Sequence, residues 1–285
     1  MMVSTILTII TFIFLGVSLV CFLLKSEAAK KIGYVLLFLT IILLAIHPFI
    51  RSSNEVYDSQ VVKKLKSGEF FVVNGQKLNA PEDAKSQFGQ DILALKANNY
   101  KKNGYYVEIG VMDGQASNNT ALLDNKYDWR GVCIDPFMKN MGERTCKQVY
   151  SALGKKAGKA NFRGLGSGFG GLDEFSTSSI HNNMWKDKVK DMSTTEVNVE
   201  TPDTVLRDVE APPVIDYLSL DVEGAEMDVL ESFPFHKHCV RFMTVETNQD
   251  KNKLRKMKDL LEPMGYVHKG SIGPDIDQIF TNECV

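Results

Sequence analysis

The order of apolar runs, glycines and acids over residues 105–135 constrains the fold more than any other feature of the chain. The first apolar run ends in Glu108, and the chain then turns through Gly110 and Gly114 before a predicted helix. A second apolar run leads into Asp135. In such a βαβ unit, glycines let the backbone approach a ligand, and the second acid accepts hydrogen bonds from ribose hydroxyls. The segment therefore predicts an α/β sheet that holds a nucleoside-bearing cofactor.

From about residue 86 the chain continues to alternate between strands and helices, which implies a mostly parallel sheet. Apolar residues recur at helical spacing after Glu223 and again after Thr247. Only a turn with Gly273 and Pro274 separates the last two predicted strands, so we expect them to form an antiparallel hairpin. The candidate strands are 105–109, 131–134, 147–152, 215–220, 241–246, 265–269 and 277–281.

The acids around the first turn favour one class of cofactor over another. Dinucleotide oxidoreductases use Gly-x-Gly-x-x-Gly to approach a pyrophosphate, and the segment 108–114 lacks that spacing. It carries Glu108 and Asp113, which would repel a pyrophosphate and attract a cation. S-adenosylmethionine carries a sulfonium and an ammonium group and no phosphate, so the pattern favours it over NAD. Two simpler interpretations stay open: an ordinary acidic turn, and a helix cap before Pro136 for Asp135.

A second glycine-rich segment, 166–171, matches Gly-x-Gly-x-x-Gly by letter. No long apolar strand precedes it, and the polar run 173–179 follows it in place of an amphipathic helix. We therefore interpret this segment as a flexible loop that could serve as an active-site lid.

Two further acids stand at the ends of predicted strands. The run 215–220 leads into Asp221, and the run 241–246 ends in Glu246. Ligands of open α/β sheets bind outside the carboxyl ends of the strands, so both carboxylates are expected there. They could orient an acceptor hydroxyl, take its proton or hold a metal ion. An equally weighted alternative is that one of them caps a helix or contacts the cofactor.

The first 50 residues differ from the rest. Residues 4–24 contain no charged side chain, and residues 32–50 contain none apart from His47. As a helix that rises about 1.5 Å per residue, each run spans roughly the 30 Å of a bilayer core. We predict a transmembrane helical hairpin over 1–50, with two buried core helices as the alternative, and a linker over 51–85.

Charge and cysteine content exclude other classes of protein. The net charge of -2 gives no general attraction to nucleic acid, and the basic run 251–258 is interpreted as the solvated face of a helix. The histidines and cysteines show no metal-ligand spacing, so no metal site is assigned. An odd, scattered set of cysteines predicts reduced thiols and a reducing compartment. The five are Cys21, Cys133, Cys146, Cys239 and Cys284.

Several motifs in this order resemble the FkbM-type S-adenosylmethionine-dependent methyltransferases. The resemblance extends over roughly residues 86–282, and any one motif alone is weak. The motifs are the turn 108–114 followed by Ser-Asn-Asn-Thr, the segments Ile-Asp-Pro at 134–136, Leu-Asp-Val-Glu-Gly-Ala-Glu at 220–226 and Val-Glu-Thr-Asn at 245–248, and the flanking pieces 86–91 and 277–280.

The resemblance implies a class I methyltransferase domain over 86–285, with a seven-stranded sheet. It implies that Asp135, where the family more often has Glu, holds the ribose and that Asp221 lies near the transferred methyl group. The candidate cofactor-binding residues are Glu108, Gly110, Asp113, Gly114 and Asp135, and the candidate catalytic residues are Asp221 and Glu246.

Members of the family typically methylate hydroxyl oxygens of sugars or other small metabolites. We therefore expect a membrane-anchored O-methyltransferase whose acceptor is a sugar, a lipid-linked compound or another small molecule, with no nucleic-acid partner. A non-catalytic, membrane-tethered binding or scaffold protein with the same fold is the main alternative. The acids at the strand ends favour the enzyme.

The orientation in the membrane is not decided by charge, because the lysines of the turn 25–31 and the basic residues of 51–64 argue in opposite directions. Since S-adenosylmethionine is made in the cytosol, we expect the catalytic domain there. The glycosylation sequon 118–120 agrees, because a glycan within the cofactor motif would obstruct the pocket.

Overall fold

The computed structural model describes residues 28, 32–35, 37, 40, 63–64, 70–73, 76–79, 84–176, 191–272 and 275–284. The predicted membrane helices, 4–24 and 32–50, fall largely outside these residues. Within the described part of the chain, no helix has the length and apolar character needed to cross a membrane. The chain divides into two compact units, 1–58 and 59–285, and the second carries the sheets described below.

The segment 51–85, which we interpreted as a linker, contains a small antiparallel sheet. Its strands are β1 (Lys63–Lys64), β2 (Phe70–Val73) and β3 (Gln76–Asn79), in the order β1-β2-β3. β2 pairs antiparallel with both β1 and β3.

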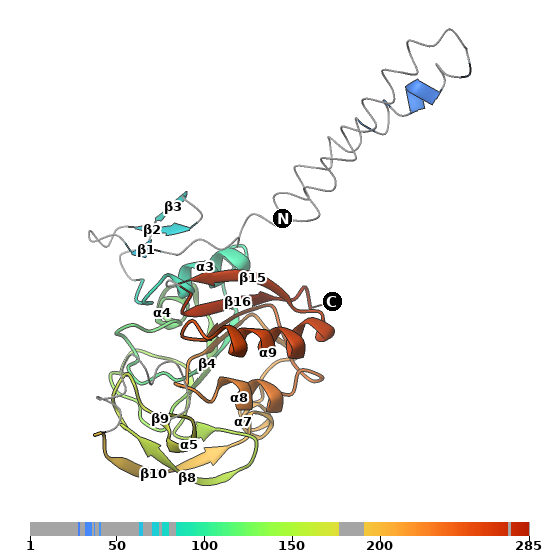
Figure 1. Ribbon diagram of the computed structural model, residues 1–285. Coiled ribbons are helices and arrows are strands. Elements are labelled where there is room, and N and C mark those ends of the chain that lie inside the picture. Colours follow the sequence, from blue (N-terminus) through green and yellow to red (C-terminus); the bar gives the residue numbers. More distant parts are fainter. Residues whose placement is uncertain are drawn as a thin grey trace. The chain divides into compact units, whose positions relative to one another are not determined.

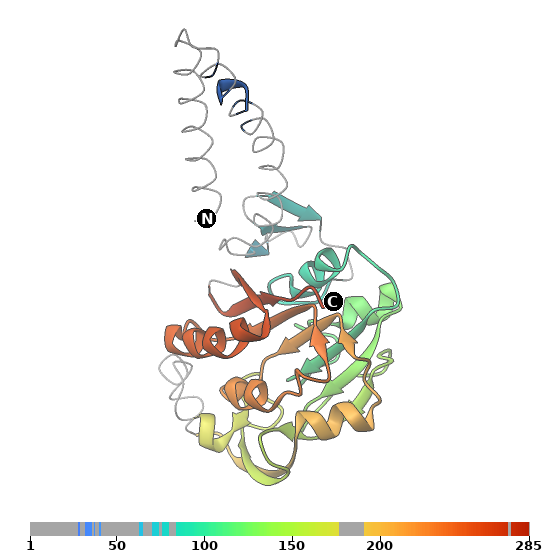
Figure 2. The same cartoon turned by 90° about the vertical axis from the view of Figure 1, so that its right-hand side faces the viewer.

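The domain is built around a seven-stranded sheet in the order β15-β16-β14-β12-β4-β5-β6 (Figures 1 and 2). Neighbours from β14 through β6 are parallel, whereas β16 is antiparallel to both β14 and β15. The expected α/β fold, with a mostly parallel sheet and a final antiparallel hairpin, is therefore found. The strands are β4 (Tyr105–Ile109), β5 (Arg130–Ile134), β6 (Lys147–Val149), β12 (Tyr217–Leu220), β14 (Phe242–Glu246), β15 (Val267–Ile272) and β16 (Asp277–Thr281).

One predicted strand is interrupted where a side chain takes over part of the backbone pairing. The run 215–220 divides into β11 (Val214–Ile215) and β12, with Asp216 between them. The Asp216 carboxylate accepts a hydrogen bond from the Tyr105 backbone N–H (2.9 Å) and pairs with Lys101 at 2.6 Å. β11 pairs instead with β13 (Cys239–Val240), in a separate two-stranded sheet.

A second, four-stranded sheet in the order β7-β10-β8-β9 was not expected from the sequence. Its two long strands, β8 and β10, are antiparallel and largely solvent-accessible, so their polar residues give little apolar alternation to detect. The run 147–152 was predicted as one strand, but its last residue belongs to this sheet. The strands are β7 (Ala152–Leu153), β8 (Gly158–Arg163), β9 (Gly171–Leu172) and β10 (Thr194–Glu200).

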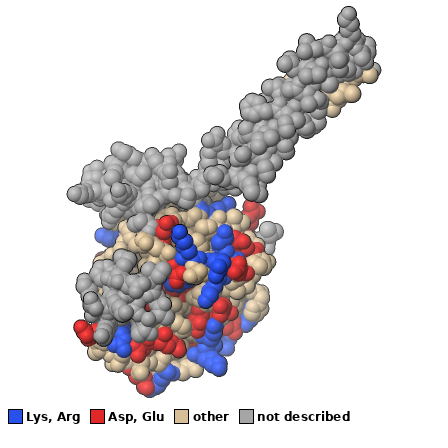
Figure 3. All heavy atoms as spheres, viewed as in Figure 1, with Lys and Arg blue, Asp and Glu red and all other residues tan. Residues whose placement is uncertain are grey.

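Helices pack on the large sheet and cover its apolar core. Thr201 caps α7 by accepting a hydrogen bond from the Thr204 N–H, and Asp250 caps α9 by accepting from the N–H groups of Asn252 and Lys253. Lys and Arg side chains gather over α9 among acidic ones (Figure 3). The helices are α3 (Gln90–Ala97), α4 (Ala121–Tyr127), α5 (Asp173–Ser176), α7 (Pro202–Asp208), α8 (Glu226–Ser232) and α9 (Lys251–Leu261), followed by the 3₁₀ turn η1 (Glu262–Met264).

The prediction that the cysteines are reduced thiols is wrong for four of them. Cys133 in β5 forms a disulfide with Cys146, and Cys239 in β13 forms one with Cys284. The Cα atoms lie 5.8 and 5.6 Å apart, which suits a disulfide. Sequence spacing does not show these pairs because the sheet brings the partners together. The inference of a reducing compartment loses its basis.

Candidate functional site

A pocket opens at the carboxyl ends of β4, β5 and β12. One wall is formed by the turn after β4, from Gly110 to Met112, and another by Asp135 and Pro136 after β5. The residue after β12, Asp221, lines the same pocket. Ligands of open α/β sheets bind at this edge, so the pocket is the candidate ligand site.

Gly110 is required by the close approach of two chain segments. Its φ is +90°, and a Cβ at this position would lie 1.6 Å from the Asp221 carbonyl oxygen. The Gly110 N–H donates to the Ile134 carbonyl at 2.9 Å. No other residue type fits there without displacing the backbone that ends in Asp221. The expected role of Gly110 in shaping the pocket agrees with this geometry.

Asp135 lies in the pocket wall, as the sequence led us to expect. One carboxylate oxygen accepts the Met112 N–H at 2.9 Å, and the other accepts the Phe137 N–H at 2.7 Å. These bonds fix the side chain and leave each oxygen with a free lone pair for a ribose hydroxyl. Burial raises the pKa of Asp135 to about 6, although the two backbone N–H groups act in the opposite direction.

Glu108 does not line the pocket; its carboxylate organises the loop behind it. Only 2% exposed, it accepts hydrogen bonds from the Thr120 hydroxyl (2.7 Å) and the Asn119 N–H (3.1 Å). The Arg144 guanidinium lies 3.5 Å away and also pairs with Asp124 at 2.9 Å. This carboxylate therefore acts on the pocket through the loop 110–120.

Asp113 and Gly114 are likewise outside the pocket lining. The Asp113 carboxylate accepts the N–H groups of Gln115 and Ala116, each at 2.9 Å, which closes the turn on itself. A Cβ at Gly114 would lie 2.6 Å from the Met141 sulfur, so this glycine makes room for a neighbouring loop and not for a ligand. The prediction of direct cofactor contact thus has no support from the position of these two residues.

The glycine-rich segment 166–171 lines the opposite side of the pocket. Gly166, Ser167, Gly168 and Gly170 all belong to the lining. A Cβ at Gly166, whose φ is +80°, would lie 3.1 Å from the ring of Phe137. The loop therefore faces the pocket wall that follows β5. This position is compatible with the active-site lid that we expected this loop to form.

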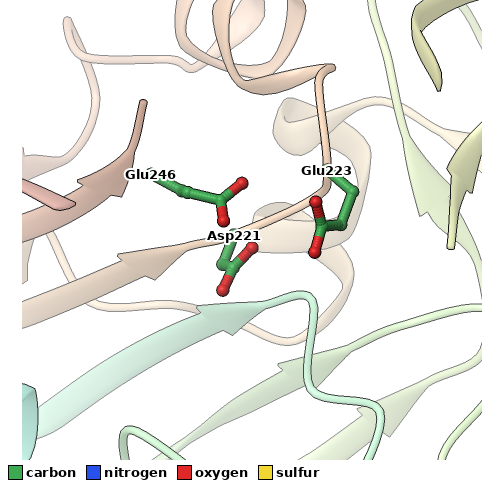
Figure 4. Close-up of side chains that lie close together, drawn as sticks. All are labelled: Asp221, Glu223 and Glu246. Carbon is green, nitrogen blue, oxygen red and sulfur yellow. The ribbon is translucent and has the colours of Figure 1, made fainter. Parts of the chain in front are cut away.

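Three carboxylates meet beside this pocket. Asp221 follows β12, Glu223 lies two residues further on, and Glu246 ends the neighbouring strand β14. One oxygen from each lies within 4.8 Å of the others, and Figure 4 shows the three side chains directed toward one another. Asp221 and Glu223 line the pocket, whereas Glu246 is buried behind them.

Burial makes ionisation of this cluster difficult. Burial, together with Asp277 and Glu226, raises the pKa of Asp221 to about 8. Burial and the charge of Asp221 also raise the pKa of Glu223 and of Glu246 well above the usual range. A carboxyl group with a pKa near neutrality is suited to exchange a proton with a substrate hydroxyl.

Sequence reasoning missed three members of this environment. Glu223 was quoted from the sequence only as part of the motif 220–226 and was given no role in the site. In the structure its φ is +55°, in the left-handed region that non-glycine residues seldom adopt. Lys253 was assigned to a solvated face, but its side chain is 11% exposed and pairs with Glu226. Asp277 comes from the distant strand β16, so no local pattern could associate it with the cluster.

The fold and the pocket together define the class of this protein. A mostly parallel sheet with a glycine turn after β4, and acids after β5 and β12, is consistent with a methyltransferase fold. The methyltransferase FkbM domain matches residues 108–268, which is more than half of the chain. The chain belongs to the FkbM methyltransferase family, as the motifs indicated.

Neither a curated protein nor a solved structure matches this chain. Members of the FkbM family generally use S-adenosylmethionine, and the pocket has the features that such a cofactor needs. The wall at Gly110 allows close backbone approach, Asp135 offers acceptors after the second strand, and no phosphate-binding glycine fingerprint follows β4.

Proposed function

We propose that this chain is a membrane-anchored O-methyltransferase that uses S-adenosylmethionine. The observation that carries the proposal is that Asp135 and Asp221 line the same pocket, each placed after one of the two strands that flank β4. S-adenosylmethionine would supply an electrophilic methyl group on a positively charged sulfur. The side chains of this domain would bind the cofactor, align the acceptor and receive its proton.

In this proposal Asp135 holds the ribose hydroxyls and the loop 166–171 covers the ligand. Asp221 receives the proton of the acceptor hydroxyl. As the oxygen–carbon bond forms, the carbon–sulfur bond breaks, and the sulfonium becomes a neutral thioether. Alignment of the two reactants supplies most of the rate enhancement, because the sulfonium is already a good leaving group. Glu246 supports Asp221 from behind, since a hydrogen bond from Glu246 acts on the Asp221 carboxyl.

The proposal also includes the membrane anchor and the class of acceptor. The uncharged runs 4–24 and 32–50 support a hairpin anchor, and an anchored enzyme suits a lipid-linked or membrane-displayed acceptor. A hydroxyl on a sugar or other small molecule fits the two carboxyl groups, Asp221 and Glu223, that line the pocket.

The supply of S-adenosylmethionine led us to expect the catalytic domain on the cytosolic side of the membrane. The two disulfides favour the opposite side. Disulfides persist in oxidising compartments and are rare in the cytosol. The sequon at Asn118 carries no information in the folded domain, because Asn118 is 1% exposed and its amide donates to Glu108. We therefore propose that the domain faces an oxidising compartment. Protease protection in sealed vesicles tests this, and cleavage from the cytosolic side would contradict it.

The activity is tested by incubating the full-length chain with methyl-labelled S-adenosylmethionine and small-molecule extracts. We expect label to appear in a hydroxyl-bearing compound, and Asp221→Asn to lower the rate by about 10²-fold or more. Asp128→Asn, which neutralises an exposed carboxylate on the same domain, should leave the rate unchanged. A chain that binds the cofactor but transfers no label to any acceptor would favour the non-catalytic scaffold.

A further inference from the structure

The three carboxylates beside the pocket belong to a larger group of acids. Within the set of three, Glu246 is buried, whereas Asp221 and Glu223 are half-buried. Glu226, which is fully buried, and Asp277, which is 6% exposed, contribute to the same local field. The charge of Lys253 acts on Asp221, Glu223 and Glu246 and favours their ionised forms. Like charges held close together at low solvent exposure are costly unless they are paired, so a bound cation would stabilise this group of acids.

Lys253 is already engaged elsewhere in the group. Its ammonium forms an ion pair with Glu226, whose other oxygen accepts the N–H groups of Val222 and Gly224 at 3.2 and 3.0 Å. Glu226 and Lys253 thus hold the turn after β12 in place. Asp277 accepts a hydrogen bond from the Gln90 amide at 2.8 Å. Glu226 and Asp277 are therefore paired within the domain, apart from Asp221, Glu223 and Glu246, whose carboxylate oxygens converge.

Glu246 gives an independent sign that something is bound there. The residue is 5% exposed, and within the described part of the chain its Oε2 has no hydrogen-bond partner. Its side chain points toward Asp221 and Glu223 (Figure 4). A buried carboxylate oxygen without a partner costs free energy comparable to that of a lost hydrogen bond to a charged group. A ligand that binds to the Glu246 Oε2 atom would offset this cost in free energy.

The geometry suits a hard divalent cation. Magnesium and calcium take oxygen ligands at about 2.0 to 2.6 Å, so two ligands on opposite sides of one ion lie about 4 to 5 Å apart. The three carboxylate oxygens, all within 4.8 Å of one another, fall in this range. The absence of cysteine and histidine from the set favours Mg²⁺, Mn²⁺ or Ca²⁺ over zinc.

We propose that Asp221, Glu223 and Glu246 bind one divalent cation of the Mg²⁺, Mn²⁺ or Ca²⁺ type at the edge of the pocket. From the sequence, holding a metal ion was one of the roles left open for Asp221 and Glu246, although no metal site was assigned. The structure adds Glu223 to these two carboxylates. If the proposed methyl transfer is correct, the ion would hold the acceptor oxygen and lower the pKa of its hydroxyl. Binding of the ion itself does not depend on the methyl-transfer reaction.

The test is a titration of the full-length chain in detergent with Mn²⁺ alone, followed by the loss of the free-ion electron paramagnetic resonance signal. Wild type should bind one ion per chain, and Glu246→Gln and Glu223→Gln should each weaken binding at least tenfold. Asp128→Asn is the matched control and should bind as wild type does, since that carboxylate is exposed and paired with Lys102. Mg²⁺ and Ca²⁺ should displace Mn²⁺ from wild type.

Absence of Mn²⁺ binding at millimolar concentration would overturn the proposal, and so would binding that both glutamine variants retain at full strength. A parallel titration with S-adenosylmethionine separates this proposal from the proposed function. Bound ion without bound cofactor would refute only the methyl-donor assignment, whereas bound cofactor without bound ion would refute only the metal site.

Discussion

Two groups of acids lie at the carboxyl edge of the same sheet, and their surroundings differ in the hydrogen-bond donors and positive charges that they provide. Glu108, at the end of β4, meets the buried Arg144 and the hydroxyl and N–H donors of the loop that follows. Glu246, at the end of β14, meets Asp221 and Glu223 and has an oxygen without a hydrogen-bond partner in the described part of the chain.

The difference shows that an acid after a strand does not by itself mark a ligand site. The groups that surround the acid decide whether it stabilises the fold or binds a ligand. A carboxylate surrounded by donors stabilises the fold, whereas carboxylates that face each other cost stability and are retained where a ligand compensates them. The Glu108 region should therefore respond to substitution through stability, and the Asp221 region through binding and activity.

The largest effect is expected where the satisfied acid is removed. Glu108→Ala leaves the buried Arg144 guanidinium with one carboxylate partner, Asp124, and takes the acceptor from the Thr120 hydroxyl. We expect a loss of about 3 to 5 kcal/mol in the free energy of unfolding, measured by urea denaturation. A loss below about 1 kcal/mol would place Glu108 among ordinary surface acids.

The disulfide beside Arg144 should give the next largest effect. Cys133 and Cys146 are 13 residues apart in sequence, and the Arg144 guanidinium donates to the Cys133 sulfur at 3.4 Å. The double variant Cys133→Ser, Cys146→Ser should lose about 3 kcal/mol of stability. The same denaturation experiment checks this, with the Cys239–Cys284 pair as an internal comparison. Equal stability with and without reductant would contradict the structural role of both bonds.

Removal of one acid from the cluster of carboxylates should change stability in the opposite direction. The pKa of Asp221 in the folded protein, about 8, lies above its unfolded value, so the folded state keeps a proton that the unfolded state has lost. Its contribution to stability is complete at low pH and is lost as the pH rises toward 8. Asp221→Asn should therefore be more stable than wild type at pH 8 without divalent cations, by on the order of 1 kcal/mol.

Thermal unfolding at pH 5 and at pH 8, with and without Ca²⁺, measures this effect. The gain from Asp221→Asn should be smaller at pH 5, where wild type is protonated. A variant that is less stable than wild type at both pH values would show that the Asp221 region is a satisfied structural site like that of Glu108.

The smallest effect concerns the pH dependence of cofactor binding. Asp135 has a pKa of about 6, so it loses its charge as the pH falls below that value. Ribose hydroxyls donate better to the charged carboxylate, and we expect affinity for S-adenosylmethionine to fall up to about tenfold between pH 7 and pH 5. Calorimetry at several pH values checks this. Asp135→Asn should bind S-adenosylmethionine more weakly than wild type, with an affinity that does not change with pH. If its affinity changed with pH as much as that of wild type, another group would be responsible for the pH dependence.

Local patterns in the sequence predicted the large sheet well. The strands β4, β5 and β14 are largely apolar runs, and Asp135 and Asp221 follow strands that flank β4. The chemistry of the pocket wall could be inferred because it depends on residues next to strand ends in the sequence.

The rest depends on contacts between distant segments. Glu108 and Asp113 looked like cofactor ligands because their partners, Arg144 and the N–H groups of the turn, are not visible in a local pattern. The second sheet was missed because β8 and β10 are mostly exposed and polar. The disulfides could not be paired from spacing, since the 45 residues between Cys239 and Cys284 are brought together only by the fold.

The central claim is that the pocket after β4, β5 and β12 binds S-adenosylmethionine through Asp135. Titration calorimetry of the full-length chain with S-adenosylmethionine tests it most directly. We expect one binding site in wild type and no measurable binding in Asp135→Ala, with unchanged binding in Asp128→Asn. Equal affinity in wild type and Asp135→Ala would contradict it.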